Sequence, residues 1–428
     1  MNRLIISGLL LVFQVFQANS STLTIEECVG KAEANYPAIK KYAPLNTTLD
    51  INLSDINKGW LPRIGAYGQV TGQNVVPSFP SALSDVMEQF GQQIKGLGKI
   101  QYKVGIDVTQ TIWDGGASKA RRDIARNQNE VETSALDVEL YGVRQRVENL
   151  YFAILLGNEQ IMQSTTTLDL LNANLERLKA MLRNGTAMQS DVDMVEAQAL
   201  ELNQTITQAR YAVESYKRGL ELFIGESLDG TELICPSEIV NMSDNNNRPE
   251  LKLFEKQIAA MRAAQNLSDV STMPVIGLFA QSYYGYPGLN YFNSMINREW
   301  SFNIVGGVKI SWNIDSFYTK KNSSRKTSAN IESITADRET FMFNTNIQKT
   351  SINENISGLR RLMVDDERIV TLRSNVRKAA ESQLENGIID TTALLSKITD
   401  ENIAKLNGTY HHIKLIQEIY NLKYTLNQ

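Results

Sequence analysis

The residues best suited to acid–base or metal chemistry do not occur in a pattern that such chemistry requires. His411 and His412 are the only histidines, and neighbours on a helix point to different faces, so one chain does not chelate an ion with both. The run Asp365-Asp366-Glu367 is typical of a solvated helix face. No Ser/His/Asp order, phosphate-binding glycine loop or zinc spacing occurs. The sequence therefore predicts no enzyme, no cofactor and no metal site.

Two segments alternate apolar and polar side chains with the period of two that marks a β-strand. Residues 101–113 and 300–313 each place their apolar side chains on one face: Tyr102, Val104, Ile106, Val108 and Ile112 in the first, and Trp300, Phe302, Ile304, Val308, Ile310 and Trp312 in the second. Residues 64–73 and 275–284 alternate less cleanly and are the expected hairpin partners. The length and pattern fit strands that cross a membrane. An ordinary soluble ribbon packed on a core is the alternative.

The four tryptophans favour the membrane interpretation. Trp60 precedes the first expected strand, Trp113 and Trp312 end the second and the fourth, and Trp300 begins the fourth. All four therefore lie at strand ends, where an aromatic belt meets the two surfaces of a bilayer. Gly/Pro-rich loops, residues 74–99 and 285–299, connect the strands of each hairpin.

The chain is duplicated. Asn35-Tyr36-Pro37 returns as Asn247-Arg248-Pro249, and Pro62-Arg63-Ile64-Gly65 returns as Pro274-Val275-Ile276-Gly277, both 212 positions later. A period this long excludes a solenoid and indicates two copies of a domain. We expect a signal peptide over residues 1–20 and a first repeat over 21–226, with a helix, a β-hairpin (62–113) and a helical hairpin (115–224). A linker over 227–247 precedes the second repeat, 248–428, with a helix, a β-hairpin (274–314) and a helical hairpin (316–427).

Each β-hairpin is followed by a very long helical pattern. Residues 117–183 contain no proline and carry a heptad of apolar residues: Leu140, Val147, Ile154, Ile161, Leu168, Leu175 and Leu182. This coiled-coil seam predicts a rod of about 100 Å. The rod turns back at Asn184-Gly185, and a second heptad includes Val192, Ala199, Ile206, Val213, Leu220 and the companion Tyr216. The second copy repeats the design less regularly, with Leu362, Ile369 and Val376 before Asn386-Gly387, and Leu406, Ile413 and Tyr420 after it.

The N-terminal segment predicts export. Arg3, the apolar run over residues 4–16 and Ala18-Asn19-Ser20 have the pattern of a secretory signal. No cysteine directly follows the cleavage site, so we expect no lipid anchor. Cys28 and Cys235 could pair in an oxidising compartment, although two separate side chains are the favoured interpretation. The net charge of −4 gives no sign of a nucleic-acid partner.

Elementary constraints then set the assembly. A strand crosses a bilayer only within a closed barrel, because backbone polar groups find no water there. The four strands of one chain cannot close a barrel. Two chains would give eight strands, and an eight-stranded barrel is filled by side chains. A conducting tube therefore needs at least three chains.

This layout resembles the TolC-like outer-membrane efflux proteins. The resemblance rests on Leu23-Thr24-Ile25-Glu26-Glu27, Trp60-Leu61-Pro62, Gln110-Thr111-Ile112-Trp113-Asp114-Gly115-Gly116 and residues 184–192, which occur in the family's order over the whole mature chain. It implies a mixed α/β membrane protein that forms a homotrimer, with a twelve-stranded outer-membrane β-barrel continuous with a twelve-helix periplasmic α-barrel. It also implies a passive exit duct of a tripartite efflux or type I secretion system, located in the outer membrane with a large periplasmic part.

The resemblance also implies partners and a site. The partners are outer-membrane lipid, a periplasmic adaptor (a membrane fusion protein) and an inner-membrane pump of the RND or ABC type. The adaptor is expected at the hairpin tips: Asn184, Gly185, Thr186, Ala187, Ser190, Asp191, Asn386, Gly387, Ile388 and Thr391. Some relatives ring their aperture with carboxylates six and nine residues after the second tip glycine, where this chain has Ala393 and Ser396. Asp191, Asp193 or Asp390 would have to replace them.

Two other interpretations compete with this one. A periplasmic coiled-coil scaffold or adaptor without a barrel would contain the same helical hairpins, with the strands as soluble ribbons. An autotransported surface protein or enzyme fits less well, because the sequence offers neither a passenger domain nor catalytic residues.

Overall fold

The protein is described by a computed structural model over residues 22–91, 93, 96–238 and 243–428, so the expected signal peptide lies outside the described residues. The chain forms two compact units. The hairpin unit comprises Met1–Lys40, Ala135–Leu251 and Glu339–Gln428, and the sheet unit comprises Lys41–Ser134 and Lys252–Arg338. Each unit takes segments from both sequence repeats. No helix of the described chain combines the length and the apolar character needed to cross a membrane.

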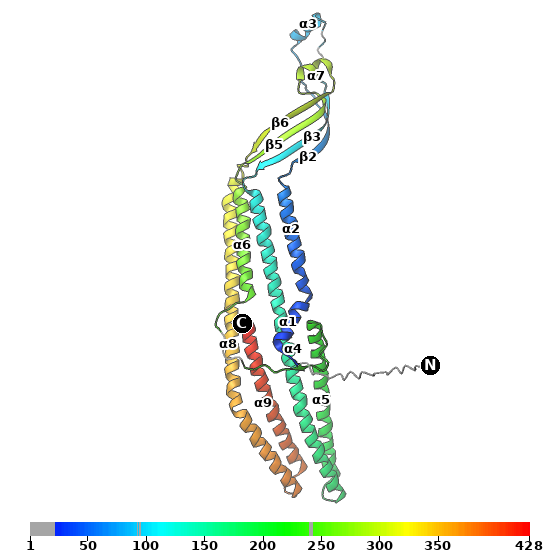
Figure 1. The fold of residues 1–428 in the computed structure, drawn as a ribbon, viewed down its shortest axis with the longest axis vertical. Coiled ribbons are helices and arrows are strands. Elements are labelled where there is room, and N and C mark those ends of the chain that lie inside the picture. Colours follow the sequence, from blue (N-terminus) through cyan, green and yellow to red (C-terminus); the bar gives the residue numbers. More distant parts are fainter. Residues whose placement is uncertain (1–21, 92, 94–95, 239–242) are drawn as a thin grey trace, which may run out of the picture. The chain divides into compact units, whose positions relative to one another are not determined.

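The sheet unit contains one antiparallel sheet (Figure 1). Its strands are β2 (Arg63–Gly72), β3 (Ile100–Trp113), β5 (Val275–Tyr286) and β6 (Ser301–Ser311), hydrogen-bonded in the order β2-β3-β5-β6. The alternation predicted β3 and β6, and β2 and β5 were expected as their hairpin partners. The connecting segments are less irregular than expected, because they contain the short helices α3 (Ser81–Gln89) and α7 (Tyr291–Asn297).

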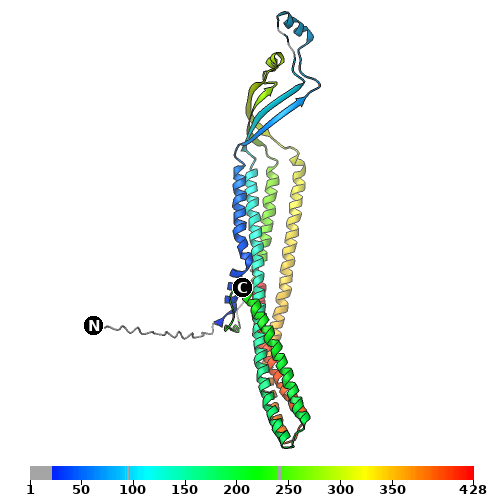
Figure 2. The same cartoon turned by 90° about the vertical axis from the view of Figure 1, so that its right-hand side faces the viewer.

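Helices continue from the strands within this unit. The helix α2 (Tyr42–Lys58) and parts of α4 (Ala117–Arg183), α6 (Pro249–Val270) and α8 (Ser316–Glu385) run side by side (Figure 2). Between β3 and α4 the chain turns through Gly115 and Gly116, whose φ values of 68° and 96° suit glycine. The Asp114 carboxylate then accepts hydrogen bonds from the backbone N–H groups of Gly116 (3.0 Å) and Ser118 (2.6 Å). Pro44 lies in the first turn of α2, where a missing N–H costs nothing.

The hairpin unit contains α1 (Ile25–Asn35), α5 (Gln189–Ile224), α9 (Thr391–Leu426) and the remaining parts of α4 and α8. Thr24 and Glu27 form a capping box at the start of α1. The predicted linker is not wholly irregular, because β4 (Glu232–Leu233) pairs in parallel with β1 (Thr22–Leu23). The Tyr151 hydroxyl lies 2.8 Å from the carbonyl of Leu23 and 2.6 Å from that of Ile234, which ties this ribbon to α4.

The heptad seam of the first helical hairpin is confirmed. Val147 and Ile154 of α4 are fully buried, and the α5 positions Val192, Ala199, Ile206, Val213 and Leu220 are at most 7% exposed. Leu175 is also buried, and the other α4 positions, Leu140, Ile161, Leu168 and Leu182, are half-buried. The companion Tyr216 is an exception, because it is exposed. The seam therefore holds α4 and α5 together as a coiled coil.

The corresponding prediction for α8 was wrong. Leu362, Ile369 and Val376 are about half exposed, at 54%, 44% and 45%, although Ile413 and Tyr420 of α9 are buried. Helix α9 directs its apolar side into a core shared with α1, α4 and α5. Other apolar residues of α8, Ile352, Ile356, Leu359 and Met363, pack against Leu415, Ile419, Leu422 and Leu426 of α9. Polar pairs also join the two helices: Arg377 Nε to Glu401 Oε2 (2.6 Å), Arg373 Nη1 to Asp400 Oδ2 (2.9 Å) and His411 Nδ1 to Asp366 Oδ2 (2.8 Å).

The duplicated Asn-x-Pro motif performs the same structural task twice. Asn35 donates through its side-chain amide to the carbonyls of Leu222 (3.4 Å) and Phe223 (3.0 Å), at the end of α5. Asn247 donates its backbone N–H to the Leu426 carbonyl (2.9 Å), at the end of α9. Both motifs therefore satisfy carbonyls that a helix C-terminus leaves without partners.

A buried carboxylate lies in the hairpin unit. Glu148 of α4 is 3% exposed, pairs with Arg144 at 3.0 Å, and has one oxygen without a hydrogen-bond partner. Burial raises the pKa of Glu148 to about 7, and the neighbouring Arg144 guanidinium offsets this effect only in part. Because the folded pKa lies above the usual value of 4.5, the stability that the protonated carboxyl provides is lost as the pH rises toward 7 and beyond.

We therefore predict that Glu148→Gln stabilises the fold at pH 8 by about 1–3 kcal/mol and changes little at pH 4. Thermal melting followed by circular dichroism at both pH values measures this difference. The control is Glu176→Gln, because the Glu176 side chain is 70% exposed on the same helix. An equal effect of Glu148→Gln at pH 4 and pH 8 would contradict a buried, neutral carboxyl.

A second prediction concerns the seam. Leu171 is 2% exposed, so Leu171→Asp removes a buried side chain and leaves an unpaired charge there. We expect Leu171→Asp to lower the free energy of unfolding by at least about 2–5 kcal/mol, the loss typical of Leu→Ala in a core. Leu171→Met keeps the volume and should cost less than about 1.5 kcal/mol. Melting temperature and protease sensitivity measure both variants, and unchanged values for Leu171→Asp would show that the seam is not buried.

Candidate functional site

The register of the sheet brings the apolar residues of all four strands to one face. Ile106 pairs with Ala66 and Ser282, and Ser282 pairs with Ile304. The same face therefore carries Ile64, Val70, Val104, Ile106, Val108, Leu278, Tyr284, Phe302, Ile304, Val308 and Ile310. Ile106 is 50% exposed and Ile304 63% exposed, so nothing in the described chain covers this face.

The opposite face of the sheet is polar. Gln281 donates from its amide to the Asp107 carboxylate (2.8 Å), and the Lys103 ammonium lies 4.7 Å from the centre of the Tyr283 ring. These side chains pair with one another across β3 and β5 as water-facing groups commonly do. The sheet thus presents one apolar face and one face on which polar side chains predominate, beside Phe279 and Val305.

The two edges of the sheet are open. Strands β2 and β6 each pair with one neighbour only, among the strands of the described chain. Their outer backbone N–H and C=O groups can therefore accept another strand.

The tryptophans lie at the strand ends, as predicted. Arg63 pairs with Thr109 and Val275 pairs with Ser311, so β2 and β5 begin where β3 and β6 end. Trp60, Trp113 and Trp312 lie at this end of the sheet, and Trp300 lies at the other. Each is between 36% and 56% exposed. Trp300 packs against Tyr102 and Tyr284, with ring centres 4.6 and 5.4 Å apart.

The two tips of the hairpin unit have the same turn geometry. Gly185 and Gly387 adopt φ values of 73° and 69°, the left-handed conformation expected from the Asn-Gly pairs. The backbone N–H of Thr186 donates to the Met181 carbonyl (2.9 Å), and that of Ile388 donates to the Gln383 carbonyl (2.8 Å). Both bonds close the last turn of the preceding helix.

Most of the predicted tip residues are exposed. Asn184, Gly185, Thr186, Ser190, Asn386, Gly387 and Ile388 are exposed, and Ala187 and Asp191 are half-buried. Thr391 was predicted to belong to the docking tip, but it is only 3% exposed because it opens α9 against the core. Met188, 72% exposed, was missed. The sequence could have indicated Met188, because it is an apolar residue that lies beside the turn and outside the heptad.

The carboxylates nearest the tips act as helix caps. Asp191 accepts a hydrogen bond from the backbone N–H of Met188 (3.0 Å), and Asp390 accepts one from that of Ala393 (2.7 Å). Asp193 accepts from the side-chain amide of Gln189 (2.7 Å). Ala393 is half-buried and Ser396 exposed. The structure therefore gives each candidate aperture carboxylate a local hydrogen-bond partner.

The tips of the two hairpins pack together (Figures 1 and 2). Leu178, Val195 and Leu394 belong to one apolar cluster formed by α4, α5, α8 and α9. The Arg177 guanidinium pairs with Glu385 at 3.0 Å, and the Thr392 hydroxyl lies 3.5 Å from the Met194 sulfur. The exposed residues of both tips thus form one surface.

The titratable clusters noted in the sequence take part in helix packing. His411 pairs with Asp366, which joins α9 to α8. No group of three or more His, Cys, Asp or Glu side chains is suitably placed for a metal within the described ranges. Cys28 is buried, Cys235 is exposed, and both are free thiols.

Part of the chain matches a known protein family in sequence. Residues 56–226, from the end of α2 to the end of α5, match the family described as outer membrane efflux protein. The match covers 171 of 428 residues. The chain resembles the TolC-like outer-membrane efflux proteins. No curated protein matches it in sequence.

Solved structures extend the resemblance to both repeats. The outer-membrane channel OprN has 12% sequence identity and a TM-score of 0.69, with 94% of this chain and 89% of that chain covered. VceC from Vibrio cholerae has 11% identity and a TM-score of 0.68, covering 94% and 95%. MtrE from Neisseria gonorrhoeae has 12% identity and a TM-score of 0.65, covering 94% and 88%. The fold is therefore that of the TolC-like channels.

The TolC-like resemblance and the predicted outer-membrane location agree, since the matched family and these structures are outer-membrane proteins. The mixed α/β fold class, mostly helical with a small sheet, is confirmed for the single chain.

Proposed function

We propose that this chain is the passive outer-membrane exit duct of a tripartite efflux or type I secretion system. Three copies form the duct, in which twelve strands close a β-barrel and twelve helices continue it as a periplasmic α-barrel. Residues 21–226 and 248–428 are the two repeats of each subunit, joined by the linker over 227–247. A periplasmic adaptor binds the tips and connects the duct to an inner-membrane pump of the RND or ABC type.

The exposed apolar face of the sheet carries this proposal. A contiguous apolar surface on a β-sheet requires a cover, and the described chain provides none for Ile106 or Ile304. Lipid is such a cover, and the aromatic residues at both strand ends suit the two bilayer surfaces. A soluble scaffold would leave this face in water.

The open edges of β2 and β6 support a closed assembly. An unpaired edge is not tolerated in lipid, so β6 of one subunit must pair with β2 of the next. Two subunits would give an eight-stranded barrel filled by side chains, whereas three give an open lumen. The half-exposed Leu362, Ile369 and Val376 of α8 supply apolar surface for contacts between subunits.

The exposed tip surface supports adaptor docking. It combines small and polar groups with two exposed apolar side chains, Met188 (72%) and Ile388 (70%). Exposed apolar residues grouped among polar ones are typical of protein interaction sites.

The barrel proposal predicts that the two faces of the sheet differ in their tolerance of charge. Ile106→Arg and Ile304→Arg each place a cation on the apolar face and should cost about 2–4 kcal/mol near the bilayer midplane. Thr109→Arg, on the polar face, should have a small effect. The measurement is the amount of trimer that resists detergent, extracted from purified outer membranes. Equal and small effects of all three changes would contradict a lipid-facing sheet.

The docking proposal predicts that tip variants lose export without losing assembly. Thr186→Arg and Ile388→Asp should abolish export in a cell that depends on this duct, because each places a charge in the proposed contact with the adaptor. Both turns lie outside the core, so trimer yield and outer-membrane insertion should remain normal. Asn203→Asp, an exposed change on α5 away from the turn, is the control. Normal export by both tip variants would place the adaptor elsewhere.

A further inference from the structure

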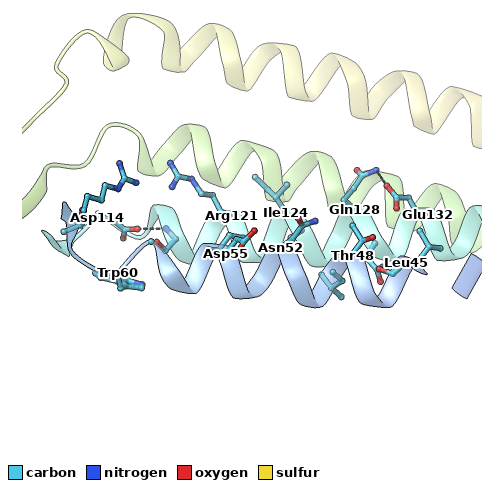
Figure 3. A pocket seen from close by; sticks show the side chains of 18 residues that line it. Leu45, Thr48, Asn52, Asp55, Trp60, Asp114, Arg121, Ile124, Gln128 and Glu132 are labelled. Atoms are coloured by element: carbon cyan, nitrogen blue, oxygen red, sulfur yellow. Dashed lines mark hydrogen bonds between the residues drawn. The ribbon is translucent and has the colours of Figure 1, made fainter. Parts of the chain in front are cut away.

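A groove of about 620 Å³ follows the start of α4 within the sheet unit (Figure 3). It lies between α2, α4 and the adjoining ends of β2 and β3. Its apolar lining consists of Leu45, Leu49 and Ile56 of α2, Trp60 just after α2, and Ile124 of α4. This volume is within the range of sites that hold small organic molecules, roughly 300–1,000 Å³.

The charged residues that line the groove are Asp55, Arg63, Asp114, Arg121 and Glu132. The three acids already have partners. Asp55 lies 3.2 Å from the Lys58 ammonium, and Asp114 accepts two backbone hydrogen bonds at the start of α4. Glu132 accepts a hydrogen bond from the Gln128 amide at 3.0 Å (Figure 3).

The two arginines are in a different situation. Neither Arg63 nor Arg121 makes an ion pair or a side-chain hydrogen bond with the residues that the structure describes. Arg121 is separated from Glu132 by eleven positions of α4, which is about 16 Å along the helix. The end of the groove beside the sheet therefore combines two guanidinium groups available to a ligand with the carboxylates of Asp55 and Asp114, which already have partners.

The strand register shows which face of the sheet these groups share. Arg63 pairs with Thr109, and Thr111 lies two residues further along β3. All three belong to the polar face, opposite Ile106 and Ile304. If the proposed function holds, this face lines the duct, so the groove opens to the path of exported solutes.

We infer that the groove is a binding site for amphipathic organic anions that pass through the duct, an inference that rests on the proposed function. The carboxylate or sulfonate of the ligand binds Arg63 and Arg121, because guanidinium groups form charge-assisted, forked hydrogen bonds with such oxyanions. The apolar body of the ligand packs on Trp60, Ile56 and Ile124. The ligand would thus contact all three elements that form the groove.

Three fluorescent probes test the inference on the purified trimer in a nonionic detergent. Dansylglycine is an amphipathic anion, dansylamide is neutral and dansylcadaverine is a cation, and all three share one aromatic body. We expect dansylglycine to bind at least about tenfold more tightly than either of the others. Equal affinity for all three would overturn the inference.

Variants locate the site. Arg63→Gln combined with Arg121→Gln should weaken dansylglycine binding at least about tenfold. Arg126→Gln removes the same charge from an exposed position of α4 that does not line the groove, and it should bind as the wild type does. Both variants must first give wild-type amounts of trimer. The same loss in both would mean that general positive charge attracts the probe, and no loss in the double variant would mean that it binds elsewhere.

A lipid head group could offer the same kind of oxyanion as an exported solute. Binding measured on the trimer in nanodiscs distinguishes these two sources. Decanoate added to the buffer should displace dansylglycine, whereas replacing phosphatidylcholine by phosphatidylglycerol in the disc should not. Displacement by phosphatidylglycerol would assign the groove to lipid and overturn its role for exported solutes. Intact trimer that binds no dansylglycine would refute this site while leaving the duct proposal in place. Failure to form trimer would refute the duct proposal itself.

Discussion

Within the part of the chain that the structure describes, nothing covers the apolar face of the sheet, and the rest of the structure depends on this constraint. The register aligns Ile64, Ile106 and Ile304 on that face across all four strands, while β2 and β6 remain open at the edges. A sheet of this kind is stable only if something apolar covers its face and other strands satisfy its edges. Lipid and neighbouring subunits meet both needs together, which is why the proposed membrane location and the proposed trimer stand on the same observation.

The two helical hairpins differ in the interactions that join their helices. Apolar heptads join α4 to α5, whereas α8 and α9 combine an apolar cluster around Ile356 with the polar pairs of Arg377, Arg373 and His411. An apolar seam has no preferred partner atoms, whereas charged pairs require a particular register between helices. Because α9 gives part of its apolar side to the shared core, Leu362, Ile369 and Val376 of α8 remain about half exposed, and in the proposed duct they are available to another subunit.

Local patterns predicted the elements, and long-range packing explains where prediction failed. The alternation of residues 101–113 and the long proline-free segment before Asn184 appear directly as β3 and α4. The exposure of Leu362 could not be predicted, because a heptad shows that a face is apolar without showing which helix covers it. Likewise, Thr391 looked like part of a polar turn, and only the packing of α9 buries it. The groove beside Arg121 depends on α2 lying along α4, a pairing that no local pattern reveals.

The carboxylates at the tips act as helix caps, and this role affects where the proposed duct can distinguish charged solutes. Asp191 and Asp390 hold the first turns of α5 and α9 through their carboxylates, so structure and ion binding would compete for the same oxygens. Ala393 and Ser396 add no charge where some relatives have carboxylates. Arg63 and Arg121, which line the groove in the sheet unit, make no ion pair or side-chain hydrogen bond with the described residues, so a ligand would not compete with the structure for them. If the proposed duct is correct, charge discrimination in this protein therefore depends more on the polar face of the sheet and its adjoining groove than on the tips.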